Sequence, residues 1–120
     1  MTNMGNSKTL SLNVTSKRAR GRGELVVSAP AAALPGAVER AAPRLPGITL
    51  TGLWQERAEF AADMTWKSFG MSIVLSFEPV DAGTTRVLAS STPAVPTTMM
   101  DFGQSKAQLS DVLAAVAAEL

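Results

Sequence analysis

Apolar and polar residues alternate along much of the chain, and this pattern predicts β-strands. The alternation is clearest in 57–66 and 70–80 and is weaker in 9–16, 24–29, 48–54 and 86–91. A period of two places successive side chains on opposite faces of a strand, so each segment has one apolar and one polar face. The positions expected to face the core are Leu10, Leu12, Val14, Ile48, Leu50, Gly52, Trp54, Ala58, Phe60, Ala62, Met64, Trp66, Met71, Ile73, Leu75, Phe77, Val87, Ala89 and Ser91.

Two other segments have the period of a helix. In the last one, Leu109, Val112, Leu113, Val116 and Leu120 form a stripe of the kind that packs on a sheet. The other begins in 28–30, with Ser28 as the expected N-cap and Pro30 near the first position. Proline inside a helix costs about 3 kcal/mol. We therefore expect this helix to be kinked, or to be short and to span 35–43.

These elements predict an α+β fold. Sheets with one apolar and one polar face are antiparallel and covered on one side, so we expect four to six antiparallel strands with two helices on one face. For residues 24–120 the order is one strand, one helix, four strands and one helix, in a single domain. Residues 1–23 form either a basic N-terminal arm or an edge strand that pairs as a hairpin.

Composition limits the chemistry. A chain of 120 residues has room for one core, and this one contains no His, Cys or Tyr. The commonest general base and the usual nitrogen and sulfur ligands of zinc are therefore absent. We expect no enzyme activity, no metal and no cofactor. No apolar run reaches the roughly 18 residues of a membrane span, and a cytoplasmic location is expected.

Charge is distributed unevenly. Residues 1–23 hold five basic and no acidic residues, a charge of +5, whereas 24–120 hold six basic and ten acidic residues, a charge of −4. Lys17, Arg18, Arg20 and Arg22 are the candidate contacts to nucleic-acid phosphates. No aromatic residue is interleaved with them for base stacking, and the acidic body repels a polyanion. We expect at most weak, non-specific binding.

From Glu24 to the C-terminus, about four fifths of the chain, the sequence resembles a group of small, uncharacterised bacterial proteins. The stretches that carry the resemblance are SFGMSIVLSFEP, TTRVLASSTPAVPTTMMDFG and QSKAQLSDVL. They stand where the group has a W-G-x-x-I-x-V strand and a T-x-x-x-D-W-G-K-N segment leading into the last helix. The order of elements is similar to a shortened START-like (SRPBCC, helix-grip) arrangement. Phe69 and Phe102 stand in place of Trp, and Gln104-Ser105 in place of Lys-Asn, so a role of that Lys or Asn does not carry over.

Such folds hold ligands between the sheet and the long helix, which implies a candidate ligand site at the start of the last helix. Methionine suits adaptable apolar surfaces. The candidate ligand-binding residues are Trp54, Trp66, Phe69, Met99, Met100 and Phe102. A structural interpretation competes: Asp101 caps the last helix, Gly103 allows close approach to the sheet, and Met100 and Phe102 pack beneath it.

The leading functional hypothesis is a non-catalytic binding module that holds a small apolar ligand between the C-terminal helix and the sheet. An alternative is a protein-interaction or homodimerisation domain that uses the outer sheet face. Val74 and Leu88 support this alternative because they are apolar residues on the otherwise polar face. Weak nucleic-acid binding through the basic arm is a further alternative.

Overall fold

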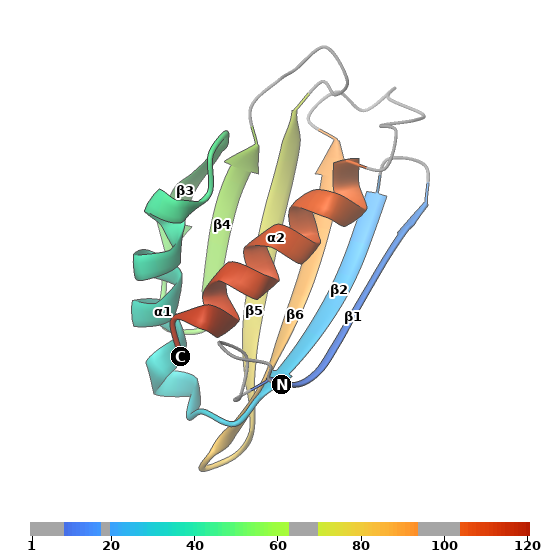
Figure 1. Cartoon of the computed structure of the whole chain (residues 1–120). Coiled ribbons are helices and arrows are strands. Elements are labelled where there is room, and N and C mark those ends of the chain that lie inside the picture. Colours follow the sequence, from blue (N-terminus) through green and yellow to red (C-terminus); the bar gives the residue numbers. More distant parts are fainter. Residues whose placement is uncertain (1–8, 18–19, 63–69, 94–103) are drawn as a thin grey trace, which may run out of the picture.

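The computed structural model describes residues 9–17, 20–62, 70–93 and 104–120. These residues form a six-stranded antiparallel sheet with two helices that contact it, which confirms the predicted fold class (Figure 1). The strands are β1 (Thr9–Lys17), β2 (Arg20–Val27), β3 (Ile48–Leu53), β4 (Arg57–Ala62), β5 (Met71–Asp81) and β6 (Thr84–Pro93). The helices are α1 (Leu34–Ala41), flanked by the 3₁₀ turns η1 (Ala31–Ala33) and η2 (Ala42–Arg44), and α2 (Gln104–Ala118).

The strand order in the sheet is β1-β2-β6-β5-β4-β3. Strands β3 to β6 form a meander, and β2 pairs with β6, which joins the N-terminal hairpin to it. Residues 9–16 therefore belong to an edge strand that pairs with β2, as the hairpin interpretation predicted. The expected boundary between residues 23 and 24 falls inside β2.

Strand β2 begins four residues before the start of the predicted segment. Its inner face carries Gly21 and Gly23 ahead of Leu25 and Val27, so the alternation continues through residues that a hydrophobic pattern does not detect. Gly23 allows close packing, because a Cβ there would lie 2.9 Å from the Cδ1 of Leu113 on α2. The glycines in 20–23 thus mark a strand that is covered closely by a helix, and the predicted start of this strand at residue 24 was four residues too late.

The first helix is the short one of the two alternatives. Helix α1 begins at Leu34, with Pro35 in its first turn, and ends at Ala41 before Pro43. Its N-cap is Ala33 and not Ser28, and no side chain caps it. Proline is tolerated in the first turn because the amide hydrogens there have no partner within the helix. The prolines therefore set both limits of α1.

A β-bulge in β3 changes which side chains face the core. Leu50 pairs with the inward Phe60, but the register then shifts, so that Gly52 lies opposite Glu59 and Leu53 opposite Ala58. Leu53 packs against the core instead of Gly52. Within 48–54 the predicted inward positions Gly52 and Trp54 were therefore wrong, because a bulge adds one residue and reverses the faces that follow in β3.

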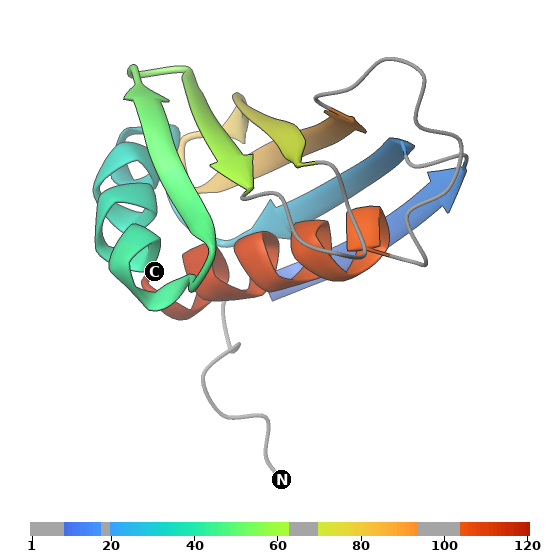
Figure 2. The same cartoon turned by 90° about the horizontal axis from the view of Figure 1, so that it is seen from above.

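The core lies between the helices and the inner face of the sheet, which curves around α2 (Figure 2). Helix α2 crosses the sheet diagonally and contacts mainly β1, β2, β6 and α1, whereas α1 lies against β3 and β4 (Figure 1). Of the predicted helical stripe, Leu109, Val112, Leu113 and Val116 are buried and Leu120 is partly buried, and the expected inward residues of β5 and β6 are buried. The expectation was wrong for Leu10 and Leu12, which are exposed on the edge strand β1, whereas Val14 packs against the core. Buried members of the core include Leu25, Phe60, Met71, Ile73, Leu75, Phe77, Val87, Leu109, Val112, Leu113 and Val116.

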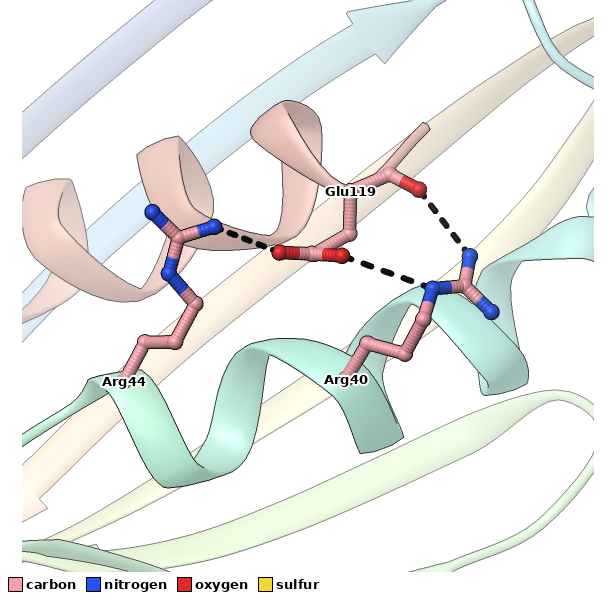
Figure 3. Close-up of polar contacts among 3 residues, drawn as sticks. All are labelled: Arg40, Arg44 and Glu119. Carbon is pink, nitrogen blue, oxygen red and sulfur yellow. Dashed lines mark hydrogen bonds and ion pairs between the residues drawn. The ribbon is translucent and has the colours of Figure 1, made fainter.

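The ends of α1 and α2 are joined by a cluster of charged residues (Figure 3). Glu119 accepts a 2.6 Å hydrogen bond from Arg44 Nη1 and forms an ion pair of 3.4 Å with Arg40 Nε. Arg40 Nη2 also donates to the backbone oxygen of Glu119. These contacts fix which side of α2 is turned toward α1.

Candidate functional site

One row of paired residues crosses the inner face of the sheet from β2 to β4 and begins with two small residues. Gly21 pairs with Ser91, Ser91 with Ile73, and Ile73 with Phe60. Phe60, Ile73 and Ser91 are buried. Two bulky apolar side chains thus stand in one row with a hydroxyl and a residue that has no side chain.

Ser91 and Gln108 carry buried polar atoms without partners. Within the part of the chain that the structure describes, Ser91 Oγ and Gln108 Oε1 are shielded from solvent and have no hydrogen-bond partner. An unmade hydrogen bond of a buried group costs about 1–3 kcal/mol. Each such group in a native protein therefore calls for an explanation, such as a bound molecule or an ordered water.

The other buried hydroxyl of β6 shows the usual arrangement. Thr85 lies on the same face of the strand, and its Oγ1 donates a 2.8 Å hydrogen bond to the carbonyl oxygen of Ala29. Two buried hydroxyls on one strand thus differ in one respect: one is paired and the other is not.

The packing of α2 places Gln108 at the same level of the sheet as Ser91. Leu113 lies against Gly23, and α2 and β2 run toward the same end of the sheet (Figure 1). Gln108 precedes Leu113 by about 7.5 Å of helix. Gly21, the neighbour of Ser91, precedes Gly23 by about 6.8 Å of strand.

The periodicity of α2 also gives the side on which Gln108 lies. Glu119 comes directly after α2 and follows Gln108 by about three helical turns, so the helical spacing places both residues on the same side of the helix axis. That side is turned toward α1, since Glu119 binds Arg40 and Arg44. Gln108 therefore faces the half of the sheet beyond β2, which begins with β6 and Ser91.

Trp54 lies away from the place expected for it. It follows β3 at the turn into β4, at the opposite end of the sheet from the first turn of α2 (Figure 1). The bulge brings Gly52 opposite the outward Glu59, and a Cβ at Gly52 would overlap the indole ring. The ring, 53% exposed, thus lines an outer depression of about 490 Å³ with Gln55, Glu56, Arg57 and Glu59. Trp54 is not part of a site between α2 and the sheet.

The other expected ligand-binding residues lie outside the described residues. These are Trp66, Phe69, Met99, Met100 and Phe102, together with the proposed cap Asp101 and Gly103. Their predicted roles stay predictions. The structure does describe the strand residues that flank these segments: Ala62 pairs with Met71, and Met71 with Pro93.

The basic residues belong to the β1–β2 hairpin instead of a free arm. Lys17 pairs with Arg20 at its end, and Arg22 is exposed on the outer face of β2. Arg18 lies outside the described residues. Their expected weak contact with nucleic acid stays a prediction.

The outer sheet face carries a shallow depression of about 440 Å³. Val74 lies in it beside Leu88, which is 37% exposed. Arg86 bridges Glu24 and Glu78 on the same face, at 2.9 and 3.7 Å. The two apolar residues that were expected on this face therefore lie there, surrounded by paired charged residues.

Residues 9–17, 20–62, 70–93 and 104–120 contain neither a cluster of metal ligands nor a membrane-spanning helix. No group of three or more Asp, Glu, His or Cys side chains there is placed to hold a metal ion. No helix in these ranges combines the length and the apolar character that crossing a membrane requires.

Sequence reasoning missed Ser91 and Gln108 as site residues. Ser91 was assigned to the inner face, where a single hydroxyl in an apolar set was the available signal. Gln108 precedes the apolar stripe of α2, and a polar side chain there is typical of a solvent-exposed position. The burial of its oxygen is a property of the packed helix.

Solved structures share this architecture. A protein from Arthrobacter aurescens superposes with a TM-score of 0.60 over 90% of this chain and 92% of its own, at 11% identity. Ara h 8.0201 gives 0.54 over 89% and 96%, also at 11% identity. The di-domain ARO/CYC BexL from the BE-7585A biosynthetic pathway gives 0.50 at 19% identity, over 82% of this chain and 45% of its own.

No family model and no curated protein matches the sequence. The structural likeness and the sheet with its long diagonal helix define an SRPBCC-like, helix-grip fold. This fold agrees with the arrangement that the sequence resemblance implied.

Proposed function

We propose that the protein is a non-catalytic binding module that holds a small apolar ligand between α2 and the inner face of the sheet. SRPBCC-like folds commonly bind hydrophobic ligands, and ligand pockets are mostly apolar with a few placed polar groups. The observation that carries the proposal is the pair of unpartnered buried atoms, Ser91 Oγ and Gln108 Oε1. They lie on the two elements that would enclose the ligand.

The composition supports a binding role over catalysis. The sequence has no His, Cys or Tyr to act as base, nucleophile or phenolic acid. Thr85 and Ser91 are the buried polar or charged residues of the described chain, and neither is hydrogen-bonded to a candidate base: Thr85 donates to the Ala29 carbonyl, and Ser91 Oγ has no partner. The inner-face row from Gly21 to Phe60 offers a ligand mainly apolar contacts.

Blocking the inner face tests the proposal. Ser91→Leu places a bulky side chain beside Gly21, whereas Ser72→Leu makes the same change at an exposed position of β5 that does not line the outer depression. Native mass spectrometry of the purified protein and titration with an environment-sensitive apolar dye measure occupancy. We expect a co-purifying molecule or dye binding in the wild type and in Ser72→Leu, and at least about a tenfold weaker affinity in folded Ser91→Leu. Absence of any bound molecule and any dye binding in the wild type would contradict the proposal.

A second use is favoured by Leu88 and Val74 on the outer face. We infer that this face contacts a second copy of the chain. Arg22 and Arg86 are balanced there by Glu24 and Glu78, so two copies that meet through this face bring no net charge together. The small side chains of Ser76 and Ser90 allow close approach.

A further inference from the structure

We propose that Ser91 and Gln108 bind the polar end of the ligand, and that this end is a neutral hydroxyl group and not a carboxylate. The inference rests on the ligand site proposed above and adds the chemistry that the site selects.

The hydrogen-bonding capacity of the two atoms defines the matching group. A serine hydroxyl donates one hydrogen bond and accepts others, whereas an amide oxygen such as Gln108 Oε1 only accepts. Both atoms are unpartnered, so a ligand group that accepts from Ser91 and donates to Gln108 satisfies both. An alcohol or phenol does so with a single oxygen. An ether or a carboxylate accepts but has no hydrogen to donate.

The lack of buried ionisable side chains among the described residues also favours a neutral ligand group. Among the described residues the buried polar or charged side chains are Thr85 and Ser91, neither of them ionisable. The Thr85 hydroxyl is already bonded to Ala29. A carboxylate moved from water to this interior would lose its hydration without gaining a cation there, and an uncompensated buried charge is strongly unfavourable. A ligand ammonium meets the same cost, because no acidic side chain is buried among these residues.

The residues around Ser91 indicate that the rest of the ligand is apolar. Ser91 is flanked in its row by Ile73, and Phe60 follows on β4. Both are buried and apolar, and Gly21 on the other side of Ser91 contributes no side chain. An apolar body along Ile73 and Phe60, with its hydroxyl at Ser91 and Gln108, matches this order.

Three probes of equal chain length separate the possibilities: 1-decanol, its methyl ether and decanoate, each titrated into the full chain by calorimetry. The alcohol donates and accepts, the ether accepts, and the acid accepts with a charge. We expect 1-decanol to bind the wild type at least about tenfold more tightly than either of the others, because each of them leaves Gln108 Oε1 without a donor.

Two variants assign the contacts. Gln108→Met keeps the length of the side chain and removes the acceptor, so the affinity for the alcohol should fall to that for the ether. Ser91→Ala removes the donor and should weaken alcohol and ether alike by about tenfold, while the matched outer-face change Ser72→Ala on β5 leaves all three affinities unchanged.

The possible failures are distinct. Equal affinities for the three probes, or tighter binding of decanoate, would overturn the hydroxyl assignment and leave the ligand site in place. An alcohol preference that is retained in Gln108→Met would overturn the role of Gln108, and unchanged affinities in Ser91→Ala would overturn the role of Ser91. Binding of none of the probes to the wild type would remove the ligand site itself, and the hydroxyl assignment with it.

Discussion

At the scale of single residues, the two buried hydroxyls of β6 allow a direct test of whether Ser91 lacks a hydrogen-bond partner within the protein. Thr85→Val removes a hydroxyl that is bonded to Ala29, whereas Ser91→Ala removes one that has no partner. We expect Thr85→Val to lower the free energy of unfolding by about 1–3 kcal/mol, because the carbonyl oxygen loses its donor. Ser91→Ala should raise it by about 1 kcal/mol in the ligand-free protein, since an unsatisfied group is replaced by an apolar one.

Urea unfolding of the two variants beside the wild type measures both changes. Ser90→Ala is the control for the change of residue type on the same strand, because its side chain is exposed. A loss of stability in Ser91→Ala as large as that in Thr85→Val would show that the Ser91 hydroxyl is hydrogen-bonded to another group of the protein. The site would then have no unfilled hydrogen-bonding capacity at that position.

Trp54 and Ser91 show what the sequence conveys about individual residues. The inward position of Ser91 follows from the alternation in 86–91. The outward position of Trp54 does not, because a bulge between Leu50 and Gly52 depends on the pairing of β3 with β4 and leaves the composition unchanged. Whether a polar atom is partnered depends on packing between α2 and the sheet, which no local pattern contains.

At the scale of elements, α2 is seated on β2 by the contact between Leu113 and Gly23. Leu113→Ala should lower the free energy of unfolding by about 2–5 kcal/mol, as a buried leucine leaves a cavity. Gly23→Ala alone should lower it by about 1–3 kcal/mol, because its Cβ displaces Leu113. In the Leu113→Ala background the same Cβ enters the vacated space, so Gly23→Ala should be stabilising there.

A double-mutant cycle by denaturant unfolding tests this contact. We expect an interaction energy of about 1–3 kcal/mol between the two positions. Simple additivity of the two changes would show that the helix is not held against β2 at this point.

The Glu119 cluster joins α1 to α2 but should contribute little to stability. Arg40 and Arg44 have side chains that are 57% and 63% exposed, and pairs of this kind contribute about 0.2–1 kcal/mol. Glu119→Gln should lower the free energy of unfolding by an amount in that range at low salt, and by less at 1 M salt, where the Debye length is about 3 Å. Thermal unfolding at the two salt concentrations, with the exposed Glu39→Gln as control, measures it. A loss above about 2 kcal/mol would mean that the cluster governs the docking of the helices.

Most elements were predictable, and the exceptions have local causes. Periods of two and 3.6 located both helices and all six strands, β2 only in its second half. The first half of β2 was hidden, since glycines occupy its inner face. The N-cap of α1 was assigned wrongly because Ser28 resembles one, while Pro35 and the packing of Leu34 determine where the short helix begins.

At the scale of the whole molecule, the sheet separates two surfaces that the proposals use differently. The inner face is closed by the helices, and the outer face carries the depression with Val74 and Leu88. The fold class followed from the sequence because one-sided sheets require a cover. The proposed ligand site between α2 and the sheet came from the sequence resemblance, whereas the unpartnered atoms of Ser91 and Gln108 emerged from the packed structure.

The outer face leads to a prediction about oligomeric state. An apolar centre with charge-balanced surroundings should bring two copies together through the same surface, in a two-fold dimer. Leu88→Glu places one carboxylate per copy at the centre of this contact, so the dimer should dissociate by like-charge repulsion and desolvation. Val80→Glu is the matched control, because Val80 is an exposed valine near the β5–β6 turn and outside the residues that line the depression. Sedimentation equilibrium over a range of concentrations should show a dimer for the wild type and Val80→Glu and a monomer for Leu88→Glu. A wild type that stays monomeric at every concentration, or a Leu88→Glu protein that still dimerises, would rule out this face as the contact between copies.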